Sequence, residues 1–104
     1  MFEVGSAVAL TDAAGRDIGS VLVDEVTPIW VCGTFTPGVH FPEVEPLFRE
    51  FEELVNDQIL SLLDPVMDAM ERLGIGLSDG TPLRDIQIYP STGDASWRPA
   101  GYRR

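Results

Sequence analysis

The first third of the chain alternates between apolar and polar positions with the period of β-strands. The segment Ile18–Val26 is rich in β-branched residues and apolar on both parities, which predicts a strand that is covered on both faces or carries a bulge at Gly19. A turn-rich connection over 11–17 joins it to a preceding strand, so the two form a hairpin. Ile29–Phe35 predicts a third strand. In the first predicted strand, the apolar residues all fall on one face; they are Phe2, Val4, Val8 and Leu10.

From Glu43 onward the period of the apolar positions becomes helical. The spacings of three and four residues predict one amphipathic helix with a broad apolar face that ends at Gly74 and Gly76. Pro46 is expected in its first turn. Pro65 allows two interpretations, because an Asp-Pro pair suits the start of a second helix, whereas the unbroken apolar stripe favours a kinked continuation. We expect the kinked helix. Its stripe consists of Val44, Phe48, Phe51, Val55, Ile59, Leu62, Val66, Met70 and Leu73.

After the helix, Leu83–Tyr89 predicts a fourth strand and 95–98 a short return strand. The expected fold class is therefore α+β: a small antiparallel β-sheet in the order β-β-β-α-β-β, with one long, kinked amphipathic helix packed across one face. We expect residues 1–98 to form a single domain and 99–104 a flexible C-terminal tail. Thr36–Pro42, with two prolines and a glycine, predicts a structured loop before the helix.

Charge excludes several classes of partner. The 104 residues carry 17 acids and seven bases, all of them arginine, for a net charge of -10. Nucleic acids and anionic membrane surfaces are bound largely through lysine and arginine, so neither is an expected partner. No apolar run has the length of a membrane span, and the N-terminus lacks the features of a signal peptide. We therefore expect a cytoplasmic protein.

The usual catalytic and metal-binding constellations are not evident in the sequence. Cys32 lies between apolar neighbours with no base nearby in sequence, which indicates a buried structural cysteine. His40 is the only histidine, and one cysteine with one histidine cannot supply a zinc site. We expect no catalytic residue, no metal and no cofactor.

An acidic helix face is the most distinctive surface that the sequence predicts. Glu50, Glu53 and Asp57 have the spacing of one helical face, which is either a solvated surface or a binding surface. Three carboxylates can also hold a hard cation, although the solvated face is the simpler interpretation. Trp30 shares a parity with Cys32 and Thr34, so it is either part of the core or an exposed interface anchor.

Our leading hypothesis is a non-catalytic interaction or regulatory module that presents this acidic helix to a protein partner with a basic surface. Glu50, Glu53, Asp57 and Trp30 are the expected partner-binding residues. Two alternatives remain open. One is a homo-oligomer formed through the Trp30 face or the helix stripe. The other is a small-ligand-binding protein or enzyme with a site under the 36–42 loop, for which His40, Arg84 and Tyr89 would supply the polar groups.

Overall fold

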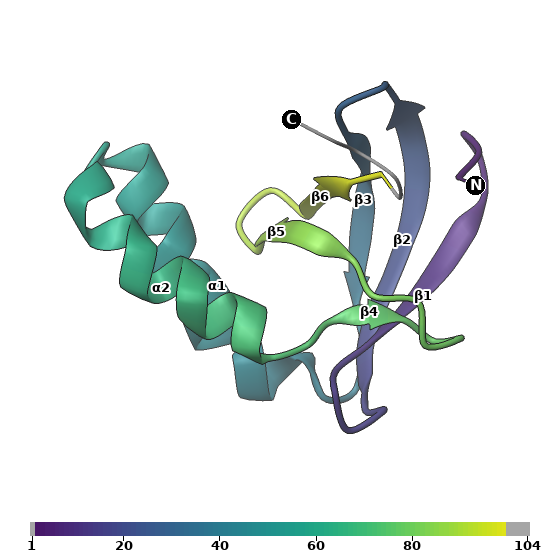
Figure 1. Ribbon diagram of the computed structural model, residues 1–104, viewed down its shortest axis with the longest axis horizontal. Coiled ribbons are helices and arrows are strands. Elements are labelled where there is room, and N and C mark those ends of the chain that lie inside the picture. Colours follow the sequence, from purple (N-terminus) through teal and green to yellow (C-terminus); the bar gives the residue numbers. More distant parts are fainter. Residues whose placement is uncertain (1, 100–104) are drawn as a thin grey trace.

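The computed structural model describes residues 2–99, which form one curled six-stranded antiparallel sheet and a hairpin of two helices (Figure 1). The α+β class is thus as expected. The order across the sheet is β4-β1-β2-β3-β6-β5. The elements are β1 (Ala7–Thr11), β2 (Asp17–Val26), β3 (Val31–Pro37), α1 (Phe41–Asn56), the short 3-10 helix η1 (Leu60–Leu62), α2 (Leu63–Arg72), β4 (Gly76–Leu77), β5 (Arg84–Tyr89) and β6 (Asp94–Arg98).

A strand is present near each predicted place, although β1 begins only at Ala7, after Phe2 and Val4, and β3 begins at Val31 instead of Ile29. The hairpin of β1 and β2 is confirmed. The pairing of these two strands shifts register where Leu10 faces Gly19 and Thr11 faces Asp17, so the expected irregularity lies beside Gly19. A side chain at Gly19 would collide with the ring of Phe35 on β3. Glycine is therefore required there because neighbouring strands approach closely.

Burial along β3 follows the period of two that the sequence predicts. Val31, Gly33 and Phe35 are buried, whereas Thr34 between them is exposed. Trp30 lies just before this strand, in the turn that follows β2, and is not a member of the buried core. The interpretation of Trp30 as a core residue is therefore wrong.

The single long helix is not confirmed. The chain forms α1 and α2 as separate helices that pack against each other, and the break between them lies at 57–59 instead of at Pro65. Pro65 is the third residue of α2, within the first turn, where a missing backbone N–H costs no helical hydrogen bond. Of the two interpretations of Pro65, the start of a second helix therefore agrees better with the structure than a kink in one long helix.

Backbone hydrogen bonds show why α1 ends where it does. Gln58 has a φ of 56°, the left-handed conformation that terminates many helices. Its N–H donates to the carbonyl of Val55 at 3.1 Å, and the N–H of Ile59 donates to that of Leu54 at 2.9 Å. These two bonds are the Schellman pattern, which usually has glycine at the left-handed position. Because glutamine stands there, the sequence carried no glycine signal for this end.

The start of α1 is also earlier than expected. The helix begins at Phe41, so Pro46 lies beyond the first turn and removes the hydrogen bond that its N–H would make to the carbonyl of Pro42. The connection from β3 is correspondingly reduced to Gly38–His40. At the other end, Gly74 follows α2 with a positive φ, whereas Gly76 belongs to β4, a two-residue strand that the sequence did not predict.

The core lies between the sheet and the near half of the helical hairpin. From α1, Phe41, Val44, Phe48 and Phe51 are buried, and Val66 and Met70 come from α2. Burial ends at Glu52: the remaining residues of α1 are half-buried or exposed, and those of η1 are exposed. The far end of the hairpin accordingly lies away from the sheet (Figure 1). The expected flexible tail falls, except for Pro99, outside the described residues.

Candidate functional site

The far end of the helical hairpin exposes apolar side chains that no part of the sheet covers. We name residues 57–64 the hairpin tip. Within it, Ile59, Leu60 and Leu62 have 41%, 66% and 54% of their surface exposed. Met67, the fifth residue of α2, is 38% exposed. Single exposed apolar residues are ordinary, but three within four positions form a candidate contact surface.

Acidic side chains surround this apolar tip. Asp57, just after α1, and Asp64, in α2, lie at its two ends, and Asp68 follows on α2; all three are exposed. From Glu50 to Glu71 the chain contains seven acids and no base. The hairpin tip therefore combines exposed apolar surface with a local excess of negative charge.

Glu50 and Glu53 lie on the solvent-exposed side of α1, and Asp57 is exposed just after its end. None of the three forms a salt bridge with any residue from 2 to 99. Arg49, a candidate partner of Glu53, pairs instead with Glu45, whose carboxylate lies 2.5 Å from its guanidinium. Within the described part of the chain no three histidine, cysteine or acidic side chains gather as metal ligands.

Glu52, a neighbour of the acidic surface in sequence, is buried and has a structural contact. Its carboxylate accepts a hydrogen bond from the Ser91 hydroxyl at 2.5 Å and a second from the Ser91 backbone N–H at 3.3 Å. These bonds join α1 to the turn between β5 and β6. The sequence signal for the burial of Glu52 was its position. It follows Phe48 by four residues and so borders the buried stripe of the helix.

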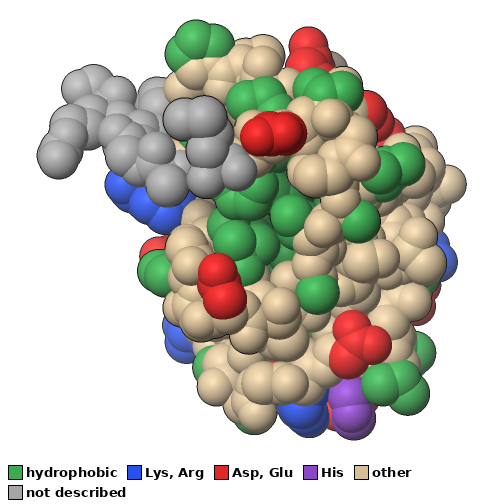
Figure 2. Space-filling model, turned by 90° about the vertical axis from the view of Figure 1, so that its right-hand side faces the viewer, with side chains coloured by type: hydrophobic (Ala, Val, Ile, Leu, Met, Phe, Trp, Pro, Cys, Tyr) green, Lys and Arg blue, Asp and Glu red, His purple; other side chains and the backbone are tan. Residues whose placement is uncertain are grey.

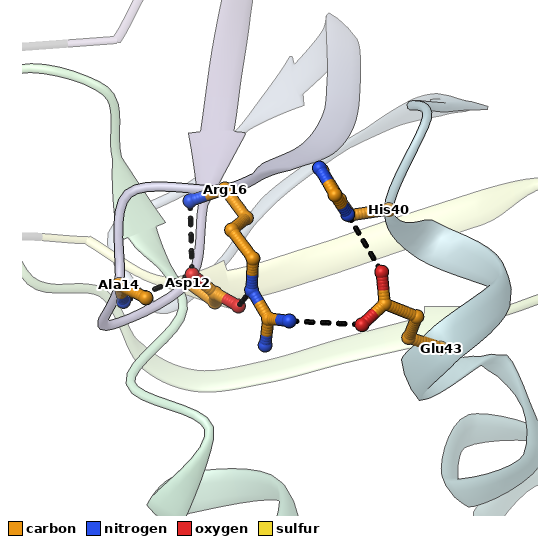
Figure 3. Close-up of polar contacts among 5 residues, drawn as sticks. All are labelled: Asp12, Ala14, Arg16, His40 and Glu43. Atoms are coloured by element: carbon orange, nitrogen blue, oxygen red, sulfur yellow. Dashed lines mark hydrogen bonds and ion pairs between the residues drawn. The ribbon is translucent and has the colours of Figure 1, made fainter.

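A chain of four hydrogen-bonded side chains holds the start of α1 against the hairpin of β1 and β2 (Figure 3). Asp12 accepts from Arg16 Nε at 2.8 Å, and Arg16 donates from Nη1 to Glu43 at 2.8 Å. Glu43 also accepts from Nδ1 of His40 at 2.6 Å. This Asp12–Arg16–Glu43–His40 chain connects a loop of the sheet with the first turn of the helix, and it helps to fix the direction in which the hairpin leaves the sheet.

Both carboxylates of this chain have shifted pKa values. Burial raises the pKa of Asp12, but hydrogen bonds from Arg16 and from the Ala14 N–H outweigh that effect and lower it below its ordinary value. The hydrogen bond from His40, together with the nearby Arg16 charge, lowers the pKa of Glu43 despite some desolvation. The ionised form of each carboxylate is thus the form that the fold stabilises.

Trp30 is only partly available as an interface anchor. The guanidinium of Arg98 lies over its ring, 4.0 Å from the centroid, which is a cation–π contact. Arg98 also donates to Asp85 at 3.3 Å. The tryptophan ring is therefore covered on one face by a neighbouring strand, in contrast to the open hairpin tip.

The three residues expected to serve a small-ligand site are not brought together. His40 lies before α1 and contacts Glu43, whereas Arg84 and Tyr89 lie at opposite ends of β5. The Tyr89 hydroxyl donates to Gln87, and burial together with Glu52 and Asp94 raises the pKa of Tyr89. A cavity of about 280 Å³ between α2 and β5 and another of about 260 Å³ are both lined by Arg84, but neither is lined by His40 or Tyr89.

Cys32 is half-buried on β3. Burial raises the pKa of its thiol, and the charges of Glu25, Asp24 and Asp94 raise it further. Because the thiolate is the nucleophilic form, these surroundings keep the sulfur unreactive near neutral pH.

The face on the side of β1, away from the hairpin, differs from the tip. Figure 2 shows acids spaced singly over this face and hydrophobic side chains at the bottom of a hollow.

Among residues 2–99, no helix has the length and apolar character to cross a membrane. Comparisons with protein families, curated proteins and solved structures find no match.

Proposed function

We propose that this protein is a partner-binding module whose docking surface is the hairpin tip. The observation that supports this proposal is the exposure of Ile59, Leu60 and Leu62 at the end of a helical hairpin that lies away from the sheet. The sheet and the near half of the hairpin serve as a rigid base, and the Asp12–Arg16–Glu43–His40 chain secures it. The tip is presented to solvent at the far end.

The charge around the tip favours a basic partner over a second copy of the chain. Two copies that met tip to tip would bring together the acids of both hairpins, and like charges in contact are unfavourable. A partner segment that carries arginine or lysine beside apolar residues would match the surface in both charge and hydrophobicity. We therefore assign the surface to a basic, amphipathic segment of another protein, with Glu50, Glu53 and Asp57 contributing to attraction and the leucines to burial.

The proposal is tested by affinity capture from a lysate of the native cells at low and moderate salt. Three variants accompany the wild type: Leu60→Ser with Leu62→Ser; Glu50→Gln with Glu53→Gln and Asp57→Asn; and Val39→Ser as the control. Val39 is 74% exposed but lies beside the start of α1, away from the tip. The expected result is one protein that the wild type and the control recover and that both tip variants lose.

The recovered partner is then purified and titrated against each variant. Loss of the acids is expected to reduce affinity more at low salt than at moderate salt, because exposed charges are screened. Recovery of the same partner, with the same affinity, by both tip variants would contradict the proposal.

A further inference from the structure

The cavity between α2 and β5 extends from the core to the surface. Its floor contains Phe51, Met70 and Ile86, which are all buried, and its rim contains the exposed Met67 and Arg84. The volume is about 280 Å³. Since a water molecule occupies about 30 Å³ of the liquid, this space suits a molecule of about nine or ten non-hydrogen atoms. Methionine side chains adapt easily to the shape of an apolar guest.

The wall formed by β5 has an irregular backbone. Against β6, the pairing shifts between Arg84 and Gln87, so β5 has one residue more than its partner over this stretch. Asp85, inside it, has a φ of 54°, a left-handed conformation that is uncommon for residues other than glycine. Bulges of this kind occur at sheet edges and redirect side chains beside binding sites. Strained conformations also concentrate at such sites.

Arg84 gives the cavity its charge preference. It forms no salt bridge with any described residue, although acids outnumber bases in this chain. Its neighbour Asp85 is paired with Arg98 at 3.3 Å and so does not neutralise it. The remaining acid of the cavity, Glu71, comes from α2, on the wall that faces β5. A ligand carboxylate would therefore lie on the β5 side, next to the guanidinium.

We propose that this cavity binds a small amphipathic carboxylate. Its apolar body lies against Phe51, Met70 and Ile86, and its carboxylate pairs with Arg84. This inference does not depend on the hairpin tip, since the tip requires a macromolecular partner and the cavity requires a molecule of about ten non-hydrogen atoms.

The test is a titration followed by amide NMR with octanoate, octan-1-ol and octylamine, three probes that share a chain length and differ in charge. We expect saturable shifts at the cavity residues with octanoate, weaker binding of octan-1-ol and the weakest binding of octylamine. Arg84→Gln should weaken octanoate binding about tenfold, as expected for the loss of one charge-assisted hydrogen bond. Glu71→Gln should strengthen it by removing a like charge.

Arg72→Gln is the matched control, because Arg72 is also exposed, has no salt bridge with a described residue and does not line the cavity. Met67→Trp provides a second, independent variant that fills the rim and should block all three probes. The proposal is overturned if octanoate causes no saturable shift at the cavity, if it binds Arg84→Gln as tightly as the wild type, or if octylamine binds as tightly as octanoate.

Discussion

Gln58 adopts a backbone conformation that costs an L-residue about 1–2 kcal/mol relative to a right-handed one. The cost is tolerated because the reversal of the chain at this point satisfies the carbonyls of Leu54 and Val55 and directs η1 and α2 back toward the sheet. The whole hairpin, and with it the exposed tip, depends on this one left-handed residue.

Replacing Gln58 by glycine should therefore stabilise the protein. Glycine adopts the left-handed conformation without steric cost, and its greater freedom in the unfolded chain offsets part of the gain. We expect Gln58→Gly to raise the free energy of unfolding in urea by about 0.5–1 kcal/mol. Glu53→Gly, at an exposed position inside α1, should lower it by about 0.5–1 kcal/mol. A loss of stability in Gln58→Gly would show that the helix end is not formed as described.

Gly19 should be among the positions least tolerant of any added side chain. A Cβ atom there would lie 2.6 Å from Cε1 of Phe35 and in contact with the carbonyl oxygen of Thr36. Because both obstacles belong to the adjacent strand of the core, we expect Gly19→Ala to cost about 2–3 kcal/mol in urea unfolding. Gly15→Ala is the control: its φ is also positive, but nothing lies within 4 Å of the added atom, so it should cost about 1 kcal/mol. Equal losses would contradict this packing.

At the scale of elements, the Asp12–Arg16–Glu43–His40 chain connects the sheet to α1. Carboxylates whose pKa is lowered in the folded protein contribute stability that is fully present above their unfolded pKa and is lost as the pH falls through the folded value. Asp12 and Glu43 both meet this condition. Their contribution should thus be complete at neutral pH, begin to decline below about pH 4 and be lost as the pH falls through the lowered folded values.

This expectation is measured by urea unfolding of the wild type and Asp12→Asn at pH 7 and pH 3. The variant should be less stable at pH 7, because it loses the charge that pairs with Arg16, and the difference between the two proteins should shrink at pH 3. Comparison at each pH cancels the general effect of the chain's net charge. Glu50→Gln, which removes an exposed acid of α1 without a salt bridge, serves as the control. A difference that stays constant with pH would contradict the role given to Asp12.

The sequence predicted the elements whose burial follows a simple period. The hairpin of β1 and β2, the alternation along β3 and the two late strands were all readable for that reason. The helical break was not, because the apolar spacing continues through Ile59 and Leu62 although both are exposed. A hydrophobic stripe records spacing but not which of its members are covered, and only the three-dimensional arrangement distinguishes core from contact surface.

The sequence likewise predicted one part of the candidate site and missed another. Exposure of Glu50, Glu53 and Asp57 agrees with the expected acidic surface. The tip was missed because Ile59 and Leu62 were placed in the apolar stripe of one long helix and Leu60 was not singled out. His40, Arg84 and Tyr89 could not be placed together or apart from sequence alone. Their separation depends on the curl of the sheet and on the bulge in β5, which arise from long-range pairing.

The molecule as a whole has a buried core at one end and the solvent-exposed hairpin tip at the other. Seven acids and no base lie between Glu50 and Glu71, and the same segment carries the exposed leucines of the tip. Charge of one sign keeps copies of the chain apart and attracts basic partners over a distance of about 8–10 Å at physiological salt. Charge attraction alone does not hold the complex together. The exposed apolar side chains then supply the contact with the partner that does.

The most direct test of this account is photo-crosslinking in the native cells from two single positions. A photoreactive phenylalanine derivative replaces Leu60 at the tip in one strain and Val39, which is also open to solvent but lies outside the tip, in the other. We predict one dominant crosslinked protein from position 60, absent from position 39 and lost when Glu50, Glu53 and Asp57 are neutralised. Identical patterns from both positions, or no crosslinked protein from position 60, would contradict the assignment of the hairpin tip as the docking surface.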